Sequence, residues 1–138
     1  MIDLHDRVRL EAVELSPLGV GRASARVALR WPGGELFTQS AEGEDSEHGR
    51  LRTAAEAAAR ALVQATRQRI TLEVLAVKSL EAFDTVLVVV SLSSKMGDLT
   101  ERLVGASLLR RRDPAHGAVL SVLDATNRLI GKVMQSGG

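Results

Sequence analysis

Residues 7–15, Arg-Val-Arg-Leu-Glu-Ala-Val-Glu-Leu, recur in similar form as Arg-Ile-Thr-Leu-Glu-Val-Leu-Ala-Val at residues 69–77. Each copy is followed by two more segments that read as strands and by a stretch with apolar residues at three- and four-residue spacing. A period of two predicts strands, and the longer spacing predicts a helix. The sequence therefore predicts an α+β fold of two successive βββα units, with antiparallel sheet covered by helices on one face.

We predict a single domain over residues 1–138, with pseudo-repeat halves at about 6–67 and 69–134. The predicted strands are 6–15, 23–31, 35–41, 70–77, 85–93 and 99–110, and the predicted helices are 49–67 and 115–134. Glycine, proline and polar residues predict turns or loops at 16–21, 32–34, 42–47, 78–84, 94–98 and 111–114. A change of alternation at Ala12 and Val13 predicts a β-bulge. Asp113 and Pro114 predict the cap and first position of the last helix.

Matching the two halves places Leu10 with Leu72 and Leu15 with Val77. Insertions between the halves fall in turns, where they cost little. The alternative, that any two βββα stretches look alike under loose matching, stays open, as does a common origin of the halves.

The amino-acid composition of the chain excludes or disfavours several classes of function. The net charge is +1, and aromatic residues are 2% with no Tyr, which disfavours nucleic-acid binding through a basic field or stacking platforms. The absence of Cys excludes disulfides and cysteine-based metal sites. The first residues do not read as a signal peptide, and no apolar run is long enough to cross a membrane. We therefore expect a cytoplasmic protein without a membrane partner.

Two successive βββα units resemble the C-terminal regulatory, leucine-sensing domain of 2-isopropylmalate synthase and citramalate synthase. The resemblance covers nearly the whole chain, at the level of element order and hydrophobic pattern. It implies two units around a pseudo-two-fold axis, a dimer and a regulatory role. Where that family has a glycine-rich segment before each helix, this chain has residues 42–49 and 110–117.

The loops before the two predicted helices carry opposite charges. The first holds Glu42, Glu44, Asp45 and Glu47, and the second holds Arg110, Arg111 and Arg112. Carboxylates stabilise a helix N-terminus, whereas arginines there oppose the helix dipole unless an anion is bound. We therefore predict that the acidic loop meets the basic loop of a neighbouring copy, or that the basic loop binds a small anionic ligand. Two solvated loops remain the alternative.

His48 and His116 each precede a glycine at the start of a predicted helix. Together with the loop carboxylates they could form the active site of a small enzyme. Imidazole and carboxylate groups are also compatible ligands for first-row metals. No histidine spacing places two ligands on one helical face, and the nucleophile-elbow, P-loop and dinucleotide motifs are absent. We therefore predict no catalytic residue, no metal and no cofactor.

The apolar segment 85–93 predicts a strand with both faces covered, one of them by a partner chain. We therefore predict a non-enzymatic regulatory or protein-interaction module that binds itself or another protein, with a small effector at an interface as one option. An alternative is a double-stranded-RNA-binding-like module over residues 49–134, which run α-β-β-β-α. The candidate ligand- or partner-binding residues are Glu42, Glu44, Asp45, Glu47, His48, Arg110, Arg111, Arg112 and His116.

Overall fold

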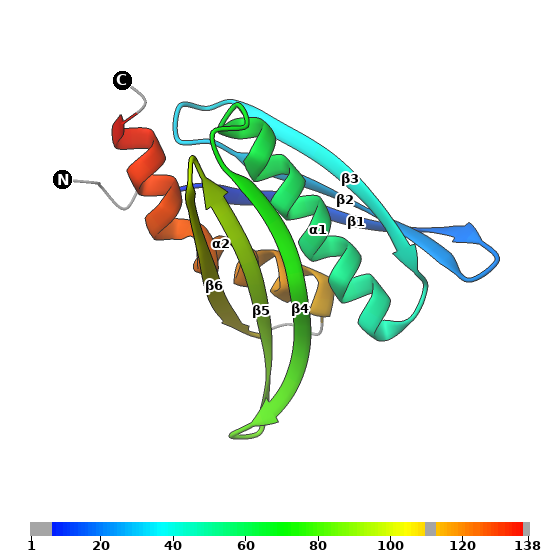
Figure 1. Ribbon diagram of the computed structural model, residues 1–138. Helices are drawn as coiled ribbons and strands as arrows, with labels where there is room; N and C mark the ends of the chain where they lie inside the picture. Colours follow the sequence, from blue (N-terminus) through cyan, green and yellow to red (C-terminus); the bar gives the residue numbers. More distant parts are fainter. Residues whose placement is uncertain (1–6, 110–112, 137–138) are drawn as a thin grey trace.

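The computed structural model describes residues 7–109 and 113–136 and confirms the α+β class and the βββα-βββα order (Figure 1). The strands form two separate antiparallel sheets, β1-β2-β3 and β4-β5-β6, which we call the first and second sheet. The elements are β1 (Arg9–Gly19), β2 (Arg22–Arg30), β3 (Leu36–Glu44), α1 (Glu47–Ala65), β4 (Thr71–Ala82), β5 (Thr85–Met96), β6 (Leu99–Leu108) and α2 (Pro114–Ser136).

Each helix packs on one face of the sheet of its own unit, as predicted. Helix α1 packs on β2 and β3, and α2 packs on β5 and β6. The two helices also contact each other, and α1 lies between the edge strands β3 and β4 (Figure 1). Six of the buried positions of α1 are alanines, and their small side chains let the helix backbone approach its neighbours closely: Ala54, Ala55, Ala57, Ala58, Ala59 and Ala61. One hydrophobic core therefore joins both units.

Several predicted connections were too long, because the strands continue into them. Strand β1 runs to Gly19, β4 to Ala82 and β5 to Met96. The actual hairpin turns need only two or three residues, whose backbones have positive φ at Gly19-Val20-Gly21 and at Phe83-Asp84. Most polar residues in these extensions are exposed, such as Lys78, Glu81 and Lys95, and Ser94 is buried but donates a hydrogen bond to Glu101 O, so ladder pairing and these contacts satisfy their polar groups. This is why a polar stretch did not mark a turn.

The first strand of each sheet contains a β-bulge in its first half, and β1 has a second register shift between Pro17 and Gly19. The pairing register shifts between Leu10 and Ala12 in β1 and between Val74 and Ala76 in β4. The bulge predicted at residues 12 and 13 is thus confirmed, slightly earlier in the chain. Counting from the bulges, Leu10 corresponds to Val74 and not to Leu72, because β4 begins two residues earlier relative to its bulge than β1 does. The residue-by-residue match drawn from the sequence was therefore wrong for this strand.

The helix starts are capped by side chains. At α1, Ser46 Oγ accepts a hydrogen bond from Gly49 N at 2.9 Å, so the helix begins two residues before the predicted position. At α2, Asp113 Oδ1 accepts a hydrogen bond from His116 N at 3.3 Å. Pro114 is the first helical residue, as predicted.

Candidate interaction surface

Each sheet has an outer face, turned away from the helices, and the two outer faces occupy equivalent places in the two units. Residues paired across antiparallel strands point to the same side of a sheet, so the register defines rows of neighbours. On the first sheet these rows carry charged and small side chains, with the exposed Leu36 as their one large apolar residue: Ser16–Ser24–Glu42, Glu14–Arg26–Ser40, Ala12–Ala28–Thr38 and Arg9–Arg30–Leu36. Such a face is readily solvated.

The second sheet's outer face has the same geometry but a different chemistry. Its corresponding rows are Leu80–Leu87–Leu108, Lys78–Val89–Ala106, Ala76–Ser91–Val104 and Glu73–Ser93–Arg102. We call the first of these the apolar row and the last the charged row. Leu80, Leu108 and Val104 are 48%, 52% and 64% exposed. Exposed apolar patches are common at interaction sites, so this face is the candidate surface.

The hairpin between β4 and β5 projects beyond the body of the molecule and carries Phe83 at its tip (Figure 1). Phe83 is 99% exposed and has a φ of 54°, and the corresponding tip residue of the first unit, Val20, is 102% exposed with a φ of 52°. A left-handed backbone costs a side-chain-bearing residue roughly 1–2 kcal/mol. Both tips thus hold a bulky apolar residue where glycine or asparagine would be more stable.

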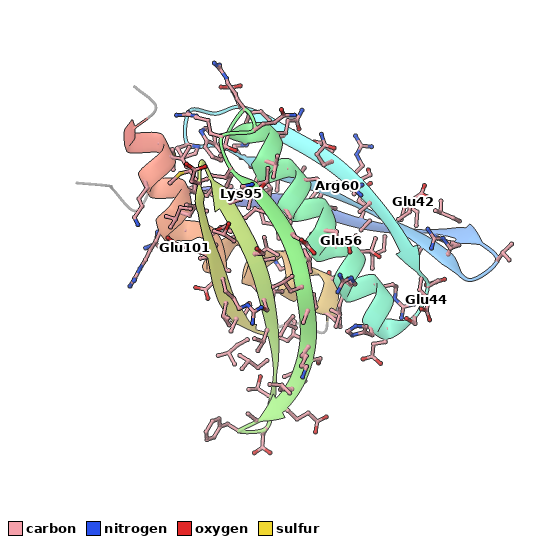
Figure 2. The ribbon with its side chains drawn as sticks, viewed as in Figure 1. Glu42, Glu44, Glu56, Arg60, Lys95 and Glu101 are labelled. Carbon is pink, nitrogen blue, oxygen red and sulfur yellow. The ribbon has the colours of Figure 1, made fainter. Side chains whose placement is uncertain are left out.

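The facing edges of the two sheets are tied to α1 by arginines. Arg52 donates from Nη2 to Val74 O at 2.9 Å, at the bulge of β4, and Arg60 donates from Nη1 to Ser40 O at 2.8 Å, on β3. Arg52 also pairs with Glu56 at 3.0 Å. Figure 2 shows Glu56 and Arg60 on the exposed side of α1. An open groove of about 750 Å³ runs along this side, and two of its cations are already engaged with the sheet edges.

The structure separates the acidic residues that the sequence grouped in one loop. Glu42 and Glu44 lie in β3, both exposed (Figure 2). Asp45 pairs with Arg50 of the same chain at 2.8 Å, and Glu47 lies in the first turn of α1. The predicted acidic loop is therefore wrong in extent, because β3 continues through Glu44. Residues 110–112, the predicted basic loop, lie outside the described part of the chain, so the predicted pairing of the two loops remains a prediction.

The two histidines lie in separate places at the starts of the helices, and both are exposed. His48 lines a shallow hollow of about 390 Å³ with Leu51 and Val77. His116 lines a larger hollow of about 730 Å³, together with Asp113 and mainly apolar side chains of β5, β6 and α2. Within residues 7–109 and 113–136, no three His, Asp or Glu side chains cluster as a metal site would require.

The alternative of an RNA-binding module treats residues 49–134 as one structural unit. In the structure, however, the elements of this segment pack on two different sheets. Helix α1 packs chiefly on β2 and β3 of the first sheet, although it also contacts β4. The exposed residues of α2 have mixed charge and include Asp124, Arg128 and Lys132.

Comparison of the chain with models of protein families gave no match, and comparison with curated proteins gave none either. In the part of the chain that the structure describes, no helix has the length and hydropathy needed to cross a lipid bilayer. The chemistry of the surfaces therefore carries the functional argument.

Sequence reasoning identified β5 as unusually apolar but missed the residues that extend its outer face onto β4 and β6. In β6, apolar residues occupy both alternation phases, with Leu103 on one face and Val104 and Ala106 on the other. In β4, Leu80 lay in a segment read as a connection. The patch could be found by looking for leucine and valine at the outward-facing positions of all three strands. This requires the strand register, because the register decides which positions face outward.

Proposed function

We propose that this protein is a non-enzymatic protein-interaction module that associates with a second copy of itself through the second sheet's outer face. The observation that carries the proposal is the contrast between the two outer faces. Among residues 7–109 and 113–136, both helices pack on the inner faces of the sheets, so folding of this part of the chain places the same demand on both outer faces. The first is polar apart from Leu36, whereas the second combines the apolar row, Val89, Ala106 and Val104 with a charged row at one end, and an association surface accounts for that difference.

The patch sets the expected strength of association. From the apolar row to the charged row, the face spans about 20 Å along the strands and about 14 Å across them. This is smaller than a standard interface of about 800 Å² per partner, so we expect a dissociation constant in the micromolar range. An isologous two-fold dimer is the simplest closed arrangement for a single patch of this kind.

The test is sedimentation velocity over a range of about 1 to 100 μM, comparing the wild type with two matched variants. Val104→Glu places a carboxylate in the middle of the apolar face, whereas Thr38→Glu places it at the corresponding position of the first sheet. We expect a concentration-dependent dimer for the wild type and for Thr38→Glu, and a monomer for Val104→Glu. Circular dichroism checks that both variants are folded. A wild type that stays monomeric throughout, or two variants that behave alike, would refute the proposal.

A further inference from the structure

Two copies can lay their second sheets face to face in only two simple ways. The two-fold axis lies in the plane between the sheets, either across the strands or along them. An axis across the strands exchanges the two ends of the face, so the apolar row of one copy meets the charged row of the other. That arrangement removes charged side chains from water against leucine, which is strongly unfavourable.

An axis along β5 brings like rows together instead. The apolar row then meets the apolar row of the second copy, and β4 of each copy lies over β6 of the other. Two sheets packed in this way keep their strand directions within about 30° of each other, the usual aligned geometry. Because this axis reverses the order of the strands, each charged side chain on an edge strand meets the opposite edge strand of the second copy.

We propose that the second copy docks with its two-fold axis parallel to β5, so that Glu73 of each copy pairs with Arg102 of the other. This inference rests on the proposed function and adds the orientation of the partner. The two residues lie at opposite ends of the charged row, on β4 and β6. Both are exposed, and among the described residues of a single copy neither forms an ion pair. The axis therefore creates two equivalent charge pairs.

The next charge on the face fits the same axis. Lys78 lies on β4 in the row of Val89, so it comes to stand over Ala106 of the second copy. At that edge of β6, the carboxylate of Asp124 accepts a hydrogen bond from Ala106 N at 3.0 Å. The lysine stem can cover the apolar surface while its ammonium group reaches this carboxylate.

The test is a charge exchange between two variants, Glu73→Arg and Arg102→Glu. Each variant alone puts like charges together at both equivalent pairs, so we expect about tenfold weaker self-association. When the two variants are mixed, both pairs regain opposite charges, and the mixed dimer should form with near wild-type affinity. Native mass spectrometry with one variant isotopically labelled distinguishes the mixed dimer from the two homodimers. The difference should shrink at about 1 M salt.

Two outcomes separate this inference from the proposed function. If the wild type dimerises and Val104→Glu does not, but the mixture shows no preference for mixed dimers, the surface is right and the axis is wrong. If the wild type does not dimerise, both fail. Lys95→Glu, a charge reversal on the same face beyond the charged row, serves as the control for general changes in charge.

Discussion

The close approach of β6 to α2 allows a quantitative test of the fold. Gly105 lies on the inner face of β6, and a Cβ atom added there would lie 2.7 Å from Ala125 Cβ and closer still to Ser121 O and Ala125 N. Carbon atoms in contact normally lie about 3.5–4.0 Å apart, so α2 must retreat by about 1 Å in Gly105→Ala. Two of the three obstacles are backbone atoms, which cannot change rotamer.

The displacement of α2 determines the expected loss of stability. Overpacking of a core commonly costs about 1–3 kcal/mol, and we expect the upper end, about 3 kcal/mol, because the backbone itself is displaced. The hydrogen bond from Ser121 Oγ to Val88 O, 2.8 Å long, lies at the same contact and should be strained as well. For a domain of this size the melting temperature should fall by about 10 °C.

The assay is urea unfolding followed by two probes. Far-ultraviolet circular dichroism reports on the whole chain, and the single tryptophan, Trp31, reports on the first unit, where its ring lies 6.1 Å from that of Phe37. Because one core joins both units, both probes should move to lower urea together. Gly33→Ala is the control, since no atom lies within 4 Å of a Cβ at that position. A Gly105→Ala variant within about 0.5 kcal/mol of the wild type would refute the packing argument, and a tryptophan transition that stays in place would refute the single core.

Three smaller changes probe the cap, the sheet edge and the hairpin tip by the same urea assay. Ser46→Ala removes the acceptor for Gly49 N and should cost about 1 kcal/mol, whereas Ser46→Asp should keep most of the stability. Arg52→Ala leaves Val74 O without its side-chain donor and should cost about 1–2 kcal/mol; no loss would mean that water replaces the guanidinium. Phe83→Asn should raise stability by about 0.5–1 kcal/mol because asparagine tolerates the left-handed backbone, and a loss of stability would show that the ring has a contact within the monomer.

Much of the fold could be predicted from local patterns. The order of strands and helices, the alanine-rich first helix, the Asp113-Pro114 helix start and the first bulge all follow from periodicity and from capping chemistry within a few residues. The limits of the strands could not be predicted, because a hairpin strand ends where pairing ends. Glu42 and Glu44 show this: they look like loop residues, yet they stand in β3 because β2 offers them partners.

The candidate surface was harder to predict from the sequence than the fold. Leu80, Leu87 and Leu108 are separated along the chain, and each taken alone is an ordinary apolar residue. Their common row exists only because β4, β5 and β6 pair in one register, and a slip by one residue would turn each slipped strand's side chains to the opposite face.

Local sequence patterns account for the two βββα units, since hydrophobic period, turn residues and caps act over a few neighbouring positions. Which face of each strand is covered follows from the packing of the helices on the sheets. Each helix shields one face of its own sheet and leaves the other uncovered, so the same alternation produces a charged outer face in the first unit and one with an apolar row in the second. That difference is a property of strands side by side, and no single stretch of the chain contains it.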